Sequence, residues 1–181
     1  NDHVTEAAEV LREQTRHRHF HMFRRLQITN YMGGRLAGRI PVIYGAGIMA
    51  PVAHRWKTQF NENSKTWAHF EVMPELNHNA VVGISFPEGL GRKVATVMLR
   101  SDYDSPRIAQ RFDETRGLLE GKAGVAVEEV RGYGRSRLAQ MLSALRHGDY
   151  TSYYLAMARG VDPTPVQPID MLKQRLGALA G

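Results

Sequence analysis

Short apolar runs alternate with longer amphipathic stretches from residue 39 onward. The runs are continuous and rich in β-branched residues, which predicts buried strands. They cover residues 40–44, 67–72, 93–99 and 123–130. Strands separated by helices, with few hairpin signals, predict βαβ units and a parallel sheet with helices on both faces. The expected fold class is therefore α/β, a three-layer αβα sandwich with a parallel sheet.

The stretches between and after these runs predict helices. They are expected at 49–63, 76–82 (a short helix or turn), 106–119, 137–159 and 165–176. Ser105 followed by proline is typical of an N-cap and first turn, and Ser136 is expected to cap the long fourth helix. This long helix is expected to break near Gly148, because glycine is a poor helix former.

The first part of the chain follows a different pattern. Residues 1–37 are expected to form an N-terminal helical arm or linker, with only a rough apolar stripe. Gly33-Gly34 is expected to interrupt the helical pattern, and Gly38 to end it. Residues 38–181 are expected to form one domain, since a chain of this length suits a single sizeable core.

The composition limits the classes of protein. The hydrophobic fraction of 43% and the charged fraction of 23% are ordinary for a globular chain. Cysteine is absent, which excludes disulfides and thiolate metal ligands. No apolar stretch approaches the roughly 20 residues of a membrane-spanning helix, and the N-terminus lacks the order of a signal peptide. A cytoplasmic protein without membrane contact is expected.

Two features of the basic N-terminal part suggest alternatives. Arginine and aromatic residues interleave at 16–25 in a chain of net charge +6, which could indicate nucleic-acid binding. The charge excess is modest and no nucleic-acid motif is present, so no such partner is expected. His17, His19 and His21 could bind a metal, but neither cysteine nor carboxylate joins them, and no metal site is expected.

The turn Gly45-Ala46-Gly47 follows the first predicted strand and precedes a helix. Its backbone N–H groups could hold a phosphate. The third glycine of the dinucleotide-binding spacing is missing, because Ala50 stands there, and no Walker lysine-serine pair follows. The turn is expected mainly to join strand to helix, with phosphate contact as the alternative.

Two polar segments carry the groups most used for proton transfer, a carboxylate and an imidazole. Glu62 stands between two asparagines, and His78 stands between two more in the segment 74–79. Because the segments follow predicted strands, both side chains are expected beyond the carboxyl ends of the sheet, where parallel folds bind ligands. The alternative is a surface glutamate and a capping histidine.

A family resemblance rests on four stretches and a dipeptide: GRIPVIYG (38–45), AHRWKTQFNENSK (53–65), PELNHN (74–79), LAMARGVDPTPV (155–166) and Leu172-Lys173. The chain resembles, over roughly residues 38–178, the C-terminal half of bacterial and archaeal bifunctional phosphoglucose/phosphomannose isomerases. In that family this half is a SIS (sugar isomerase) domain, a parallel-sheet αβα sandwich. The resemblance thus implies the same fold class as the hydrophobic pattern.

The resemblance implies aldose–ketose isomerisation of 6-phosphosugars, from glucose 6-phosphate or mannose 6-phosphate to fructose 6-phosphate, through a cis-enediol. Glu62 matches the glutamate that moves the proton between C1 and C2. His78 matches a ring-opening histidine contributed across a homodimer, and Lys173 matches a lysine near the ring oxygen. The expected substrate-binding residues are Thr164, Asn77 and Gly45. No cofactor and no metal are implied.

The sequence also departs from the family. Its members carry a first SIS domain that binds the sugar phosphate and stabilises the enediolate with an arginine. This chain has neither a GxGGSG-like turn nor the matching Ser/Thr-rich loop. It is therefore expected to be an incomplete enzyme that needs an N-terminal SIS domain or a partner chain. The alternative is a non-catalytic SIS module that senses a phosphosugar or serves in dimerisation.

Overall fold

The structure is a computed structural model that describes residues 2–16 and 21–177, with the backbone alone for residues 16 and 21–28. Four parallel strands form its centre. The strands are β1 (Ile40–Ala46), β2 (His69–Met73), β3 (Val94–Arg100) and β4 (Ala126–Arg131). Their order in the sheet is β2-β1-β3-β4, and every neighbouring pair is parallel. The predicted parallel sheet is confirmed.

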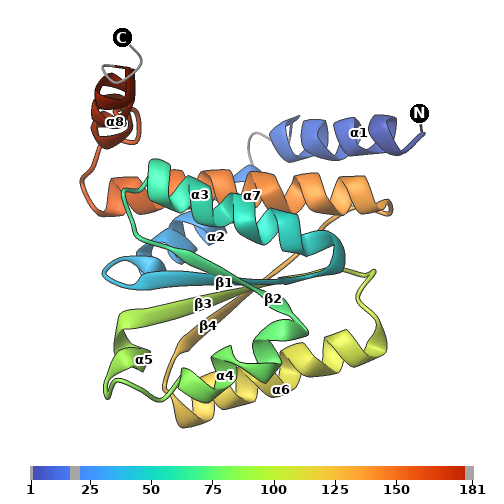
Figure 1. The fold of residues 1–181 in the computed structure, drawn as a ribbon. Coiled ribbons are helices and arrows are strands. Elements are labelled where there is room, and N and C mark those ends of the chain that lie inside the picture. The colour runs from blue at the N-terminus through green and yellow to red at the C-terminus, as the bar shows by residue number, and fades with distance from the viewer. Residues whose placement is uncertain (1, 17–20, 178–181) are drawn as a thin grey trace.

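The helical elements of the described chain are α1 (Asp2–Arg16), α2 (His21–Leu36), η1 (Gly47–Met49), α3 (Ala50–Glu62), η2 (Glu75–His78), α4 (Ala80–Gly83), α5 (Leu90–Lys93), α6 (Pro106–Lys122), α7 (Arg137–Ala158) and α8 (Gln167–Gly177). Helices α2, α3 and α7 lie over one face of the sheet, and α4 and α6 over the other (Figure 1). This arrangement confirms the three-layer αβα sandwich. None of the helices in the described ranges combines the length and apolar character that a bilayer span requires.

Alternating side chains of the strands fill a separate core on each face of the sheet. Ile43 of β1 packs in the same core as Trp56 of α3. The next residue, Tyr44, packs in the other core with Phe112 of α6. This change of side from one residue to the next is the period of a strand. Burial on both faces also explains why the strands read as continuous apolar runs.

Both predicted serine caps are confirmed. The Ser105 hydroxyl accepts a hydrogen bond from the Ile108 N–H at 3.3 Å at the start of α6. The Ser136 hydroxyl accepts one from the Ala139 N–H at 3.2 Å at the start of α7. Each cap satisfies an N–H that the first turn of a helix leaves without a partner, so these helix starts are determined locally.

Helix α7 is continuous, so the predicted break near Gly148 is wrong. A Cβ on Gly148 would lie 2.4 Å from Nε1 of Trp56. The Trp56 indole N–H donates to the carbonyl oxygen of Ala144 at 2.9 Å. Gly148 therefore admits the indole against the helix. Burial of Trp56 offsets the roughly 1 kcal/mol that glycine costs inside a helix.

Helix α2 is also continuous, so the predicted interruption at Gly33-Gly34 is wrong. A Cβ on Gly33 would lie 3.0 Å from the backbone nitrogen of Leu155 in α7, so this glycine allows the two helices to approach closely. Met32 and Leu36 of α2 join the same core as Leu155. The second half of the predicted arm is thus packed on the sheet layer, while the division of the chain at residue 37 stays a prediction.

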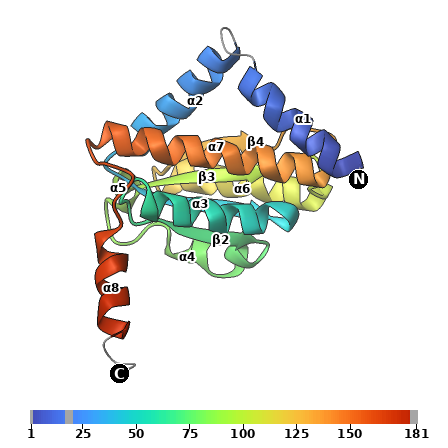
Figure 2. The ribbon, with the colours of Figure 1, turned by 90° about the horizontal axis from the view of Figure 1, so that it is seen from above.

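Helix α1 packs on the first half of α7 (Figure 2). Ala7 and Val10 pack with Ala139 in a small separate apolar cluster. Arg146 of α7 donates from Nη1 to the carbonyl oxygen of Leu11 at 2.7 Å. Apolar contacts and a charged hydrogen bond therefore hold α1 on the domain.

Candidate functional site

Glu62 is the last residue of α3, and this end of α3 lies at the amino edge of the sheet (Figure 1). Helix α3 joins the carboxyl end of β1 to the amino end of β2, so it runs opposite to both strands. Its 13 residues span roughly 20 Å, which is enough to return the chain across the sheet. The prediction that Glu62 lies beyond the carboxyl ends of the strands is wrong, because the crossover helix reverses the direction of the chain.

His78 lies at the carboxyl edge of the sheet, as predicted. It ends η2, which follows β2 after one residue, and its side chain is exposed. The five residues of β2 span roughly 16 Å, and Glu62 and His78 lie beyond opposite ends of that strand. One copy of the chain therefore does not bring the two side chains to a single small substrate.

The two asparagines beside Glu62 hold the end of α3 in place. The Asn61 Oδ1 accepts a hydrogen bond from the Ala68 N–H, just before β2, at 2.9 Å. The Asn63 Nδ2 donates to the Ser152 hydroxyl of α7, also at 2.9 Å. Each amide ties α3 to a different neighbouring segment. The Glu62 carboxylate is exposed, but the backbone that carries it is held in place by these two hydrogen bonds.

Two cations hold the turn that follows Glu62. Lys65 has a φ of 52°, which is uncommon for a residue other than glycine, and its Nζ donates to the carbonyl oxygens of Glu62 and Pro163. Arg159, directly after α7, donates from Nη1 to the Lys65 carbonyl oxygen at 2.9 Å and to the Thr66 hydroxyl at 2.6 Å. These bonds join the turn after α3 to the segment that leads into α8.

A groove of about 400 Å³ lies between this turn and the beginning of α8. Glu62 and Lys65 are its charged lining residues, and Trp67 contributes an aromatic ring. The rest of the lining consists of Asn61, Thr66, Pro165, Val166, Pro168 and Ile169. A few polar groups on mostly apolar walls are typical of sites for small molecules.

The predicted residue Thr164 directly precedes this groove, and Lys173 lies on α8, whose first turn lines it. The Thr164 N–H donates to Oδ1 of Asp162 at 2.8 Å. Hydrogen bonds from the Thr164 N–H and hydroxyl lower the pKa of Asp162. Thr164 thus forms a turn directly before the groove-lining Pro165. Lys173 is exposed on α8, four residues beyond the lining residue Ile169.

Helix α8 projects away from the layers, and each of its residues is exposed (Figure 2). Its spacing places Ile169, Leu172 and Leu176 on one face, with exposed fractions of 38%, 57% and 57%. A helix of this length gains most of its stability from packing of such a face. The described residues leave this face of α8 uncovered.

On the opposite edge, Asn77 is bonded to α6 at both ends of its amide. Its Nδ2 donates to the Thr115 hydroxyl at 2.8 Å, and its Oδ1 accepts from Nη1 of Arg111 at 3.1 Å. These bonds attach η2 to α6 and so fix the backbone that carries His78. The contact of Asn77 with a substrate stays a prediction.

Gly45 also lies at the carboxyl edge, near the end of β1. A Cβ there would lie 2.6 Å from the carbonyl oxygen of Met49, so a side chain is excluded where the chain turns back into α3. Gly47 adopts a positive φ of 46°. The turn serves to join strand to helix, and its contact with a phosphate stays a prediction. The expected site residues thus fall into two groups: Glu62, Thr164 and Lys173 at the amino edge, and His78, Asn77 and Gly45 at the carboxyl edge.

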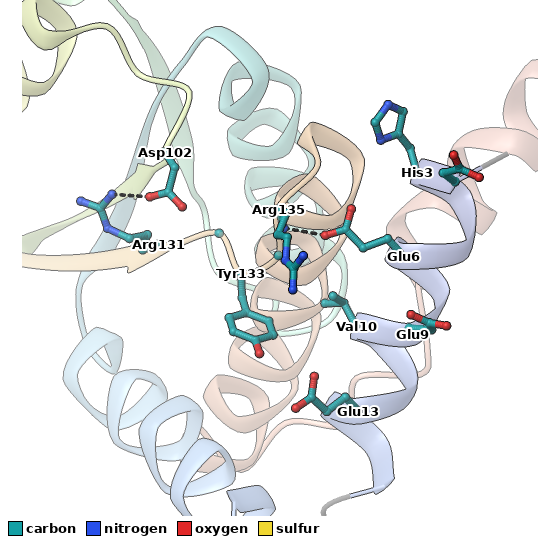
Figure 3. Close-up of a pocket in the computed structure, with 12 residues that line it drawn as sticks. His3, Glu6, Glu9, Val10, Glu13, Asp102, Arg131, Tyr133 and Arg135 are labelled. Atoms are coloured by element: carbon teal, nitrogen blue, oxygen red, sulfur yellow. Dashed lines mark hydrogen bonds and ion pairs between the residues drawn. The ribbon is translucent and has the colours of Figure 1, made fainter.

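A second concavity, of about 790 Å³, lies beyond the carboxyl ends of β3 and β4 and is partly covered by α1 (Figure 3). The backbone N–H groups directly before α7 point to this concavity but already have a partner. The Glu6 carboxylate accepts hydrogen bonds from the N–H groups of Arg135, at 2.6 Å, and Ser136, at 3.0 Å. Bonds from the Ser136 hydroxyl and these N–H groups lower the pKa of Glu6. On the opposite wall, Arg131 pairs with Asp102 at 3.0 Å. Glu6, Asp102 and Arg131 of this concavity are therefore paired within the chain.

Among the side chains that the structure describes, no group of three or more His, Asp or Glu residues has an arrangement that could hold a metal ion. The cluster His17, His19 and His21 lies outside the described side chains, and so does the basic stretch 16–25.

Three residues of the amino-edge groove and its turn were not expected from the sequence, namely Lys65, Trp67 and Arg159. The side chains of Lys65 and Arg159 donate hydrogen bonds to backbone carbonyl oxygens. The positions of these oxygens depend on the tertiary structure, so the sequence did not indicate the bonds. Trp67 stood at the start of a predicted strand, where burial is the ordinary expectation. The one available signal was a large aromatic residue placed between a helix end and a strand.

A family model described as the bacterial phosphoglucose isomerase C-terminal SIS domain matches residues 29–176. Bifunctional phosphoglucose/phosphomannose isomerases of Caldicellulosiruptor bescii and Aquifex aeolicus are 42% and 39% identical to the chain over 146 and 145 residues. These matches cover 80% of this chain but only 43% and 45% of the two relatives, so the chain spans less than half of their length.

Among solved structures, the chain is similar to a glucose-6-phosphate isomerase like protein from Thermus thermophilus. The TM-score is 0.66 and the sequence identity is 25%. The match covers 88% of this chain and 51% of that protein. The fold is thus that of one half of a longer relative.

Proposed function

Because the chain belongs to the family of bacterial phosphoglucose isomerase C-terminal SIS domains, we propose that it supplies the proton-transferring half of an isomerase for 6-phosphosugars. The observation that carries the proposal is the position of Glu62. It is the exposed carboxylate of the amino-edge groove, on a helix end that two asparagines hold in place. A carboxylate carried on a fixed helix end next to bound substrate suits a general base.

In the proposed reaction, Glu62 removes the proton from C2 of the open-chain aldose and returns it to C1. The electron pair of the broken C–H bond forms a cis-enediolate, and a proton moves between the two oxygens. Glucose 6-phosphate or mannose 6-phosphate thereby becomes fructose 6-phosphate. Lys173 is proposed to lie near the ring oxygen, and Thr164 to contact the substrate, because both belong to the segment adjoining the Glu62 groove.

We propose that His78 assists ring opening in the site of a neighbouring subunit. The support is geometric: His78 and Glu62 lie at opposite edges of the sheet within one chain. A symmetric dimer can place the carboxyl edge of one copy against the amino edge of the other, which gives two equivalent sites. The homodimer and the transfer of His78 across it belong to the proposal.

The phosphate and the enediolate oxygens need further donors, which we propose come from an N-terminal SIS domain. That domain would be part of the same polypeptide or of a partner chain. Two observations support this: the chain spans less than half of its relatives, and α8 leaves an apolar face uncovered. The proposed partner surface includes the helix that carries Lys173.

The test uses the complete open reading frame that contains this chain, assayed for conversion of fructose 6-phosphate to glucose 6-phosphate. Glu62→Gln keeps the shape of the side chain but removes its basicity, and we expect a fall in kcat of about 10³-fold or more. Glu120→Gln, at an exposed position on α6, is the matched control and leaves kcat unchanged. Wild-type turnover in the Glu62→Gln variant would refute the proposal.

A non-catalytic module that binds a phosphosugar is the second candidate, suggested by the separation of Glu62 and His78 at opposite edges of one copy. It predicts a thermal shift with 6-phosphosugars or 5-phosphoarabinonate in the complete protein without turnover. Turnover that depends on Glu62 would exclude it.

A further inference from the structure

Trp67 is an unusually exposed large aromatic residue, with 70% of its surface accessible. Tryptophan is ordinarily among the more deeply buried side chains, since it carries the largest apolar surface. The other tryptophan of the chain, Trp56, follows this rule and is 1% exposed. An indole that remains in solvent is free to contact a ligand.

The backbone on both sides of Trp67 is fixed. The preceding Thr66 hydroxyl is bonded by Arg159, and the following N–H, of Ala68, is bonded by Asn61. Ala68 is completely buried. The ring of His69 lies 4.8 Å from the indole in an edge contact. The backbone that carries the exposed indole is thus held by the same Asn61 that adjoins Glu62, and the His69 ring contacts the indole itself.

Trp67 and Glu62 line one groove. A sugar presents C–H groups on its faces and hydroxyl groups at its edges. A flat aromatic wall suits the C–H groups, and a carboxylate with a neighbouring ammonium group, from Lys65, suits the hydroxyls. The apolar residues Pro165 and Ile169 complete the lining without adding a charge.

We propose that Trp67 is a substrate-stacking residue, whose indole packs on a C–H face of the sugar while the hydroxyls turn toward Glu62. This inference rests on the proposed isomerase function and extends it to a residue that binds without exchanging protons. A contact made equally in the ground state and the transition state lowers KM and leaves kcat unchanged. Trp67 is therefore expected to affect KM selectively.

The kinetic test compares Trp67→Ala and Trp67→Phe in the complete protein, with fructose 6-phosphate as substrate. We expect Trp67→Ala to raise KM about 5-fold with kcat within about 2-fold, and Trp67→Phe to raise KM less than about 2-fold, since a phenyl ring still stacks. Tyr31→Ala is the matched control, an aromatic residue 61% exposed on α2 and outside the groove, and it leaves both constants unchanged.

A binding measurement gives a second readout that does not need turnover. Of the two tryptophans in this chain Trp56 is buried, so the part of the fluorescence quenching by 5-phosphoarabinonate that Trp67→Phe abolishes reports on Trp67. We expect quenching in the wild type and in Glu62→Gln, and its loss in Trp67→Phe. This readout still decides the matter if Trp67→Ala does not fold.

The two proposals fail in different ways. In the first case, the wild type converts fructose 6-phosphate and this activity depends on Glu62, but Trp67→Ala has the wild-type KM and 5-phosphoarabinonate does not change the fluorescence. The stacking role of Trp67 is then wrong, and the proposed isomerase function is supported. If the wild type does not convert fructose 6-phosphate, the proposed isomerase function is wrong. The fluorescence quenching alone then tests whether Trp67 contacts a ligand. If Trp67→Ala changes only the self-association of the protein, Trp67 faces a second copy and the stacking role is wrong.

Discussion

Glu62 and His78 lie at opposite edges of one parallel sheet, Glu62 at the end of the helix that leads into β2 and His78 at the end of the 3-10 helix that follows β2. The arrangement follows from the βαβ connection, in which the helix returns the chain to the edge where the strands begin. Two chemically suited groups that are close in sequence are therefore far apart in one copy. A shared site for them requires a second copy.

A mixed-subunit experiment tests this arrangement. Glu62→Gln and His78→Asn are each expected to be nearly inactive alone. In a dimer with one subunit of each kind, one site has both substitutions and the other has neither. After equal mixing and subunit exchange, roughly half of the dimers are mixed, so roughly a quarter of the wild-type activity returns.

The activity is measured before and after denaturation and refolding of the mixed variants, with each variant refolded alone as the control. If the mixture stays as inactive as its components while mixed dimers are present, Glu62 and His78 do not act across the dimer.

Arg159 is expected to stabilise the turn that positions Glu62. Arg159→Ala removes hydrogen bonds to Lys65 and Thr66, and we expect a loss of about 1–3 kcal/mol of unfolding free energy, measured by urea denaturation. Arg107→Ala, at an exposed position on α6, is the control with an expected change within about 0.5 kcal/mol. Equal effects of the two substitutions would contradict the role of Arg159.

Gly148 is expected to tolerate no side chain. Gly148→Ala would place a Cβ 2.4 Å from the buried indole of Trp56, so we expect a loss of about 3 kcal/mol or more. Gly117→Ala on α6, where a Cβ meets no atom within 4 Å, should instead stabilise the protein by about 0.5–1 kcal/mol, because alanine favours a helix. Thermal unfolding of the two variants tests the contrast, and a stable Gly148→Ala protein would argue against this packing.

The attachment of α1 is expected to depend on pH through Glu6. Bonds from Ser136 and Arg135 lower the pKa of Glu6 in the folded state, so the ionised carboxylate contributes stability. This contribution is present above the unfolded pKa of about 4 and is lost as pH falls through the lower folded value.

Glu6→Gln should therefore lower the Tm at pH 7, and the difference from the wild type should shrink as the pH falls below about 4. Scanning calorimetry of both proteins at a series of pH values, from pH 7 to below about 4, measures this difference in Tm. Glu9→Gln, exposed on the same helix, is the control and should show no such pH dependence. A Tm difference for Glu6→Gln that is constant with pH would mean that the charge is not involved.

The fold class, the strands and the serine caps could be predicted from the sequence because each depends on neighbours in the chain. A run buried on both faces must be continuously apolar, and Ser105 and Ser136 bond N–H groups three residues ahead. Glu62 and its asparagines could be singled out for the same reason, since they form one contiguous motif.

The errors concern features that depend on distant parts of the chain. Gly33 and Gly148 were expected to disrupt helices, yet they lie where Leu155 and Trp56 approach across the core. The edge at which Glu62 lies depends on the direction of α3, and the exposure of Trp67 depends on where Asn61 and Arg159 hold the backbone. The sequence by itself determined which elements form and which groups could transfer a proton, because those are local properties. Only the tertiary structure decided which of those groups share an edge, because packing joins residues that no sequence spacing relates.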